Sequence, residues 1–322
     1  MKQSVLISGG GIVGTFLGIE LASRNIPFKI IEKYLPEPSE FDGIRSLTLN
    51  STTHDRLKAL GVETAPSMIQ EMRVLDGLGT GNLSFAAQEA NLDCLAAVVN
   101  FAELRNTLLQ KVSDMIIPSQ EIASFRSHQP GITAVLSDDS ELEASLLVIA
   151  EGRNSKLAEL ISPQKNQKNY HQIARTFLAQ IPGLETDQAI QIFYEREIFA
   201  LMPYNTGDTR NTFSVVWSVP EEMRAPESQD EIFDELSKFE KKLACKIDPI
   251  SKILTFPLFA HHLNEYCDEG ICVIADSAHS IHPLAGQGIN LGLADASILA
   301  EEIERGFNAG QNIGHIAFLK KY

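Results

Sequence analysis

Two glycine-rich stretches have the residue types and spacing that bind phosphate groups. The first, Gly9-Gly-Gly-Ile-Val-Gly14, lies between a short apolar run and an amphipathic stretch, an order typical of a strand, turn and helix that bind a dinucleotide. In such a unit Gly9 permits the tight turn, Gly11 lets a pyrophosphate approach the backbone, and Gly14 lets helix and strand pack closely. A single glycine equally serves an ordinary turn, but this order indicates a dinucleotide site.

An acidic residue at the end of the next apolar run narrows the choice of dinucleotide. The run 28–31 has the length of a strand, and Glu32 follows it directly. At this position a carboxylate accepts a hydrogen bond from a ribose hydroxyl and repels a 2′-phosphate. Glu32 therefore predicts FAD or NAD rather than NADP.

The second stretch combines a carboxylate with the start of a helix. The apolar run 271–275 is typical of a buried strand, which would deliver Asp276 to the edge of a sheet. After Pro283, the sequence Gly286-Gln287-Gly288 precedes a long run with apolar residues at helical spacing. Such a start directs free backbone N–H groups and the positive end of a helix dipole outward. It favours an anion, or a ring that becomes anionic.

This second stretch resembles the GD box and the Gly-Gln-Gly-x-Asn-x-Gly-x-x-Asp-Ala sequence of the FAD-dependent aromatic hydroxylases, the single-component flavoprotein monooxygenases. The resemblance implies that Asp276 binds the ribityl chain of FAD, that Asn290 belongs to the FAD site, and that the glycine loop faces the isoalloxazine. Reduced flavin is an anion at N1, which backbone N–H donors stabilise. The flavin-facing catalytic candidates, with no acid or base assigned, are Pro283, Gly286, Gln287 and Gly288.

Elsewhere the chain matches this family at some positions and departs from it at others. Arg45 stands before a Leu-x-x-Leu-Gly helix, where the family has an arginine that contacts FAD. Phe101 stands where most members have a polar residue beside the flavin, within a stretch, 98–112, that predicts a helix. In the family's Asp-Gly-x-x-Ser-x-x-Arg motif, this chain has Glu151 for the aspartate and Ala158 for the arginine. Reduced nicotinamide, NAD(P)H, is therefore a weaker expectation than FAD.

Two strand-like segments resemble the subgroup that hydroxylates ubiquinone precursors. They contain Ala-Leu-x-Pro and Ser-x-Val-Trp-Ser-x-Pro, and the resemblance implies that they line a substrate pocket beside the flavin. The residues expected in this pocket are Leu201, Met202, Pro203 and Val216. The implied reaction hydroxylates the aromatic ring of a polyprenylated phenol. Reduced nicotinamide gives hydride to flavin N5, O2 adds at C4a, and the hydroperoxide transfers an oxygen to the ring.

The resemblance covers the whole chain and implies an α/β fold. We expect a Rossmann-like FAD-binding domain with an inserted, mostly antiparallel β-sheet substrate domain. The expected FAD domain comprises 1–70, 98–165 and 262–322, and the substrate domain comprises 71–97 and 166–261. The stretch 315–322 has a helical pattern without a glycine or proline stop. We expect a C-terminal helix that is cut short, and relatives that continue beyond it.

Composition excludes several classes of function. The formal net charge of −15 among 322 residues disfavours nucleic acid and gives no attraction to anionic lipid. No apolar run reaches the length of a membrane span, so we expect a cytoplasmic protein. The resemblance implies that a further C-terminal segment of the relatives provides peripheral contact with the inner membrane, and that other ubiquinone-biosynthesis proteins are partners. No metal site is expected, because His279 and His282 lack a third ligand, and the four cysteines form no Cys-x-x-Cys pair.

Two alternatives to aromatic hydroxylation stay open. One is another flavin monooxygenase, such as an epoxidase or an enzyme for a different aromatic substrate. The other is a flavoprotein subunit without catalytic activity in a biosynthetic complex, which the departures at Phe101, Glu151 and Ala158 allow. Rapid reduction of the flavin by reduced nicotinamide would distinguish a catalyst from a scaffold.

Overall fold

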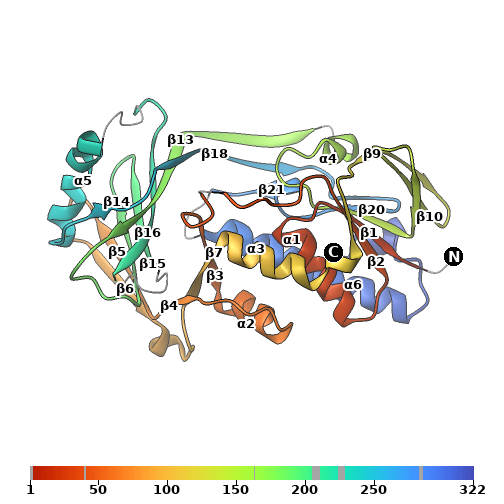
Figure 1. Ribbon diagram of the computed structural model, residues 1–322, viewed down its shortest axis with the longest axis horizontal. Helices are drawn as coiled ribbons and strands as arrows, with labels where there is room; N and C mark the ends of the chain where they lie inside the picture. Colours follow the sequence, from red (N-terminus) through yellow and green to blue (C-terminus); the bar gives the residue numbers. More distant parts are fainter. Residues whose placement is uncertain (1–2, 40, 163, 205–210, 224–228, 283–285) are drawn as a thin grey trace.

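Two large sheets occupy opposite ends of the molecule. The computed structural model describes residues 3–39, 41–162, 164–204, 211–223, 229–282 and 286–322. Two long strands, β13 (Lys165–Gln180) and β18 (Leu254–Leu263), run from one end to the other, with helices packed beneath them (Figure 1). No helix in these ranges is long and apolar enough to cross a membrane.

The first sheet carries the N-terminal glycine loop. Its strand order is β19 (Cys267–Asp268), β20 (Ile271–Val273), β12 (Leu146–Ile149), β1 (Val5–Ser8), β2 (Phe28–Glu32) and β8 (Ile116–Pro118). All pairs are parallel except β19 with β20. The strands are continuous apolar runs because both faces of the sheet are covered. The predicted strand 271–275 is shorter than expected, since it ends at Val273 and the 3-10 turn η3 (Ala275–Ser277) follows.

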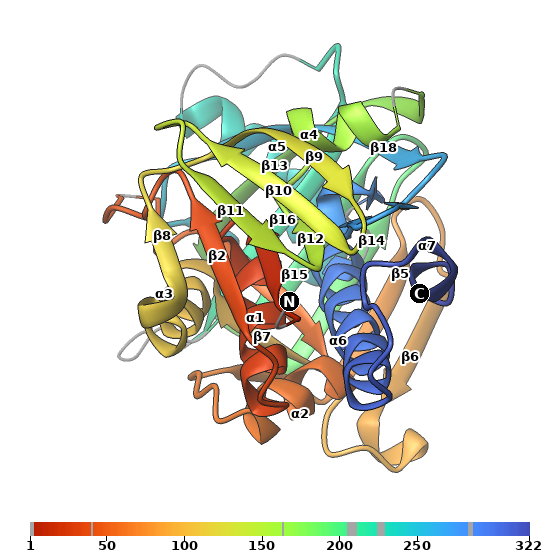
Figure 2. The ribbon, with the colours of Figure 1, turned by 90° about the vertical axis from the view of Figure 1, so that its right-hand side faces the viewer.

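Different elements cover the two faces of this sheet. On one face, α1 (Ile12–Ser23) and α6 (Gln287–Asn308) pack together against the sheet. On the other face lies a three-stranded antiparallel sheet of β9 (Ile122–His128), β10 (Gly131–Leu136) and β11 (Glu141–Ala144), drawn in yellow-green in Figure 2. The short helix α4 (Lys156–Ile161) adds its apolar side to this second face.

The helix predicted over 98–112 is wrong in its first part. Residues Ala96–Asn100 form strand β7, which lies between β3 (Ser46–Asn50) and β4 (Ser67–Ile69) in a small antiparallel sheet. The β-branched Val98 and Val99 favour this pairing. The helix α3 (Phe101–Lys111) then begins after Asn100, whose side chain accepts the backbone N–H of Glu103 at 2.9 Å. The 3-10 turn η2 (Ser113–Met115) follows α3, and α2 (Ser51–Ala59) follows β3.

The second large sheet is mostly antiparallel. Its order is β21 (His279–Ser280), β18, β13, β16 (Thr212–Pro220), β15 (Ile198–Pro203), β14 (Gln188–Phe193), β5 (Glu71–Asp76) and β6 (Asn82–Ala86). Only β14 and β5 pair in parallel, and β17 (Asp248–Pro249) pairs with β13. The helix α5 (Gln229–Leu243) covers one face, where Trp217, Phe199 and Phe239 form an aromatic core. The 3-10 turn η1 (Ala87–Ala90) follows β6.

Both segments predicted for the substrate domain contribute strands to this sheet, and β21 joins it from the C-terminal segment. The pairing of β21 with β18 places Ser280 beside His261, and their side chains are 2.8 Å apart. The prediction of the α/β fold class with a parallel sheet and a mostly antiparallel sheet is therefore confirmed. The exact domain boundaries stay a prediction.

The C-terminal stretch differs from the expected long helix. Only Ile316–Leu319 are helical, forming α7, whose last turn closes at Lys320. His315 supplies the N-cap, because its ring accepts the backbone N–H of Ala317. Phe318 packs against Gly306 of α6, where a side chain on the glycine would collide with the ring. This contact, rather than a long helical run, holds the segment against α6.

Candidate cofactor and substrate site

The glycine loop after β1 forms one end of a cavity of about 630 Å³ between the two large sheets. Gly9 turns with φ of +105°, and an added Cβ there would lie 2.4 Å from the carbonyl oxygen of Ala150. At Gly14 an added Cβ would lie 1.9 Å from the carbonyl oxygen of Gly9, so α1 can approach the loop only without a side chain. At Gly11 an added Cβ meets nothing within 4 Å, and the backbone is open to the cavity.

Glu32 lies at the end of β2, beside this loop. Its carboxylate accepts the backbone N–H of Gly10 and the backbone N–H of Tyr34, the latter at 2.9 Å. These bonds fix the carboxylate at the cavity wall. The predicted position of Glu32 next to Gly11 in one cavity thus holds in the fold.

The start of α6 also lines this cavity. Gly286 is the N-cap residue with φ of +64°, and an added Cβ there would lie 3.0 Å from Cβ of Thr48. Gly288 has nothing within 4 Å of an added Cβ, so its backbone is open to the cavity. Neither α6 nor α1 has a side-chain N-cap or an acidic residue in its first turn. Two helix starts therefore offer backbone N–H groups to one cavity.

Arginine side chains add positive charge at the cavity. Arg45 stacks on the ring of Phe101, with its guanidinium carbon 3.9 Å from the ring centroid. Partial burial and the nearby charges of Arg153 and Arg105 lower the pKa of Arg45. Among the described residues, the buried Nε of Arg105 has no hydrogen-bond partner. Since guanidinium groups this close repel one another, the cluster is suited to an anion.

Phe101 lies where the family has a polar residue beside the flavin. Its ring lines the cavity and holds Arg45 by a cation–π contact. An aromatic face at this place can pack on a flavin ring or a flavin side chain. Where the family has a polar residue, this chain therefore has an aromatic ring that packs on Arg45.

Asp276 lies in η3 and lines the cavity. The surrounding protein partly desolvates its carboxylate and raises the pKa of Asp276, although Arg153, His261 and His279 act in the opposite direction. The turn is held from α6, because Asp295 accepts the backbone N–H of Ala275 at 2.9 Å. Asp295 also lies 2.6 Å from Nε2 of His279, which accounts for this histidine without a metal.

Asn290 contacts the backbone on three sides. Its amide nitrogen donates to the carbonyl oxygens of Thr48 at 2.8 Å and Gly286 at 3.1 Å. Its side-chain oxygen accepts the backbone N–H of Asn50 at 2.9 Å. Asn290 therefore joins α6 to β3 and positions the glycine loop, while direct contact with FAD stays a prediction.

The other two departures from the family pattern have structural counterparts. Glu151 lies at the cavity wall, where Ser155 Oγ donates to its carboxylate at 2.7 Å and Ser8 Oγ donates to the same group. Ala158 is buried under the second face of the first sheet, where an arginine would not fit. Arg153 instead supplies the charge in this segment and lines the cavity.

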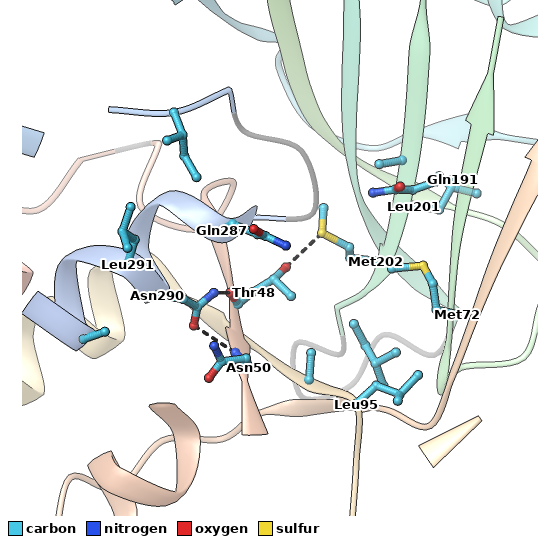
Figure 3. A pocket seen from close by; sticks show the side chains of 15 residues that line it. Thr48, Asn50, Met72, Leu95, Gln191, Leu201, Met202, Gln287, Asn290 and Leu291 are labelled. Atoms are coloured by element: carbon cyan, nitrogen blue, oxygen red, sulfur yellow. Dashed lines mark hydrogen bonds between the residues drawn. The ribbon is translucent and has the colours of Figure 1, made fainter. Parts of the chain in front are cut away.

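A second cavity of about 500 Å³ adjoins the first. We call it the side chamber (Figure 3). Its wall is mostly apolar and carries no charged side chain among the described lining residues. The two cavities meet at a common wall, which we call the junction. Its residues are Thr48, Gln191, Ala200, Met202 and Ile281.

The predicted substrate-pocket residues lie around this junction, with one exception. Leu201 lines the side chamber, Val216 lines the cofactor cavity, and Met202 lines both. Pro203 ends β15 opposite Phe213 and is outside the lining of both cavities. Gln287 lines the side chamber, and the predicted Pro283 falls outside the described residues.

The donors around the larger cavity fit FAD. The free start of α1 with Arg45 and Arg153 matches a pyrophosphate, the free start of α6 matches a ring that becomes anionic, and open carboxylates match ribose and ribityl hydroxyls. The chain also matches the family model described as "FAD binding domain" over residues 2–311. The chain belongs to this FAD-binding family. The predicted cofactor FAD is confirmed.

Other members of the FAD-binding family align with nearly the whole chain. It is 27% identical to a ubiquinone hydroxylase, UbiL, of Rhodospirillum rubrum, covering 99% of this chain and 76% of that protein. It is 26% identical to 3-demethoxyubiquinol 3-hydroxylase of Escherichia coli, covering 84% of that protein. Klebsiella pneumoniae HpxO, solved with FAD and uric acid, shares the fold with a TM-score of 0.77 at 18% identity, covering 99% of this chain and 83% of HpxO.

Sequence patterns did not reveal three of the residues that line the larger cavity. Arg153 lies within the altered family motif, directly after Gly152, while Thr48 lies on β3 and Gln191 lies on β14. The alternation of Ala189, Gln191 and Phe193 would have marked one face of a strand. It would not have shown which face meets the cofactor.

Proposed function

We propose that the protein is an FAD-dependent monooxygenase that hydroxylates the aromatic ring of a polyprenylated phenol, a ubiquinone precursor, with O2 and NAD(P)H. The observation that carries the proposal is the uncharged, apolar side chamber that joins the FAD cavity. The names of the relatives from Rhodospirillum rubrum and Escherichia coli support a ubiquinone precursor as the substrate.

The side chains around the FAD cavity bind and orient the cofactor. Arg45 and the two helix starts hold negative charge, and Glu32 and Asp276 accept hydroxyl groups. When bound, FAD supplies the acceptance of hydride from reduced nicotinamide and the activation of O2. The backbone N–H groups at the start of α6 stabilise negative charge that develops on the ring without reorganisation.

The junction of the two cavities places the substrate and keeps water out. Met202 and Val216 present apolar side chains there, and Ala200 leaves room for a ring. Exclusion of water protects a reactive oxygen donor from unproductive breakdown. No acid or base is required of these residues, because an electron-rich phenol is itself the nucleophile.

The proposed substrate has an apolar tail that favours a membrane. We place the reaction in the cytoplasm, with the protein in peripheral contact with the inner membrane or with other ubiquinone-biosynthesis proteins. Exposed apolar side chains on and next to the edge strand β6 support such a contact: Leu78, Leu83 and Phe85.

Anaerobic mixing with NADH or NADPH, with and without a short-chain prenylated phenol, tests the proposal. We expect substrate to accelerate flavin reduction in the anaerobic mixture, and 18O2 admitted afterwards to the reduced protein with substrate to label the hydroxylated product. Substrate-independent reduction without a labelled product would favour another monooxygenase reaction. Absence of reduction would favour a scaffold subunit.

A further inference from the structure

A row of paired residues crosses the second large sheet at the junction of the two cavities. Gln191 on β14 pairs with Ala200 on β15, which pairs with Val216 on β16, which pairs with Thr176 on β13. All four line the FAD cavity, and Gln191 and Ala200 also line the side chamber. The other three side chains of the row are short. Gln191 is therefore the long polar side chain of this wall.

The amide of Gln191 faces the cavities and has no protein partner among the described residues. Its residue is only 9% exposed, and within the described parts of the chain its side chain makes no hydrogen bond. Figure 3 shows the amide directed from β14 into the space in front of Met202. Gln188 on the same strand, by contrast, donates to the Glu71 carboxylate at 2.9 Å. An amide that opens into a mostly apolar cavity without a protein partner is free to donate to and accept from a ligand there.

We propose that Gln191 recognises the substrate by a hydrogen bond to an oxygen on the ring, which places the ring at the junction and the apolar tail in the side chamber. This inference rests on the function proposed above. An amide both donates and accepts, so it suits a phenol hydroxyl or a methoxy or quinone oxygen. None of the described residues that line both cavities, where the ring would lie, carries a cation to pair with a carboxylate. The preferred substrate class is therefore a neutral prenylated phenol rather than a hydroxybenzoate.

Binding to the oxidised FAD-loaded protein tests this role without turnover. The probes are 2-prenylphenol, prenylbenzene without the hydroxyl, and a prenylated 4-hydroxybenzoate, each titrated by the change in the flavin absorption spectrum. In the unchanged protein we expect the phenol to bind more tightly than the other two. In Gln191→Leu we expect phenol binding to weaken about tenfold, the effect of one buried hydrogen bond, and prenylbenzene binding to stay unchanged. Gln188→Leu is the matched control and should alter neither.

Each other outcome has a defined meaning. Equal weakening of phenol and prenylbenzene in Gln191→Leu would show a merely structural role and overturn the inference. Unchanged phenol binding in that variant would also overturn it, while the proposed function stands if the phenol is hydroxylated. If the unchanged protein neither binds nor hydroxylates any prenylated phenol, the proposed function fails and the inference fails with it.

Discussion

Asp276 and Gly288 serve the cofactor cavity in opposite ways. Asp276 brings a carboxylate to a place where partial burial raises its pKa, which means that the surrounding protein disfavours the ionised form. Gly288 leaves its backbone open because it has no side chain. Each residue therefore allows a substitution that alters one property of the site.

Asp276→Ala is expected to lose FAD. It removes an acceptor of ribityl hydroxyls and leaves those donors unpaired, at a cost of about 1–3 kcal/mol. The flavin absorbance of the purified protein, followed by titration with FAD, measures the loss. Asp276→Asn keeps an acceptor oxygen and should retain more flavin. Full occupancy of Asp276→Ala at low FAD would refute the assignment.

Gly288→Val is expected to block the approach of the flavin ring to the start of α6. The added side chain would enter open cavity space rather than the protein core, so the fold should persist. Overpacking of the bound state costs about 1–3 kcal/mol, which corresponds to a loss of roughly tenfold to a hundredfold in hydroxylation. Product formation per unit of flavin is the measurement, with Gly288→Ala as an intermediate variant. Normal turnover of the valine variant would show that the loop does not face the flavin.

At the level of elements, one side chain joins α6 to β3. Asn290 bonds to backbone atoms of Thr48, Asn50 and Gly286, which lie on both sides of the cavity junction. The strand β3 follows Arg45 directly and carries Thr48. The geometry of the glycine loop and of the arginine cluster therefore depends on the same amide.

Asn290→Ala is expected to reduce both stability and FAD affinity. Unpaired backbone groups cost about 1–3 kcal/mol in the free energy of unfolding. Asn50→Ala is the control, because Asn50 caps α2 by accepting the backbone N–H of Thr53 at 2.8 Å and should cost about 1 kcal/mol without affecting FAD. Urea unfolding and FAD titration of both variants separate the effects. Unchanged FAD affinity in Asn290→Ala would show that the loop keeps its geometry unaided.

At the level of the whole molecule, the helices under the first sheet are joined at one buried carboxylate. Glu20 on α1 is fully buried and pairs with Arg24 and with Arg56 of α2, and it accepts the hydroxyl of Ser297 on α6 at 3.0 Å. Burial alone would raise the pKa of Glu20. The hydrogen bonds and charges of Arg56 and Arg24 outweigh burial and lower it below its ordinary value of 4.5.

This lowered pKa predicts how stability depends on pH. A carboxyl whose pKa is lower in the folded state stabilises the fold above pH 4.5, and this contribution is lost as pH falls through the folded-state value. Glu20→Gln should lower the free energy of unfolding by about 3–5 kcal/mol at neutral pH and flatten the acid limb of the stability curve. Glu304→Gln removes only the more exposed partner of Arg24 and should change little. The thermal unfolding midpoints of both variants, measured across pH, test this prediction. An unchanged acid limb of the stability curve in Glu20→Gln would contradict it.

The local motifs of the FAD site were readable from the sequence, because their geometry depends on neighbours in the chain. The turn at Gly9 and the left-handed N-cap at Gly286 follow from residues that tolerate positive φ, and Glu32 follows from the end of a short strand. The family pattern then predicted FAD and the two-sheet architecture. The stretch 98–112 showed the limit, since Val98 and Val99 pair with strands that a helical pattern does not reveal.

Only the tertiary structure decided which distant residues meet. Arg153 and Phe101 join Arg45 through separate elements, and Gln191 reaches the junction through pairings that extend across four strands. The face that a strand turns to a cavity depends on its register with partners far along the chain. For that reason motifs predicted the cofactor, whereas the residue that we propose for substrate recognition emerged only from the packed sheets.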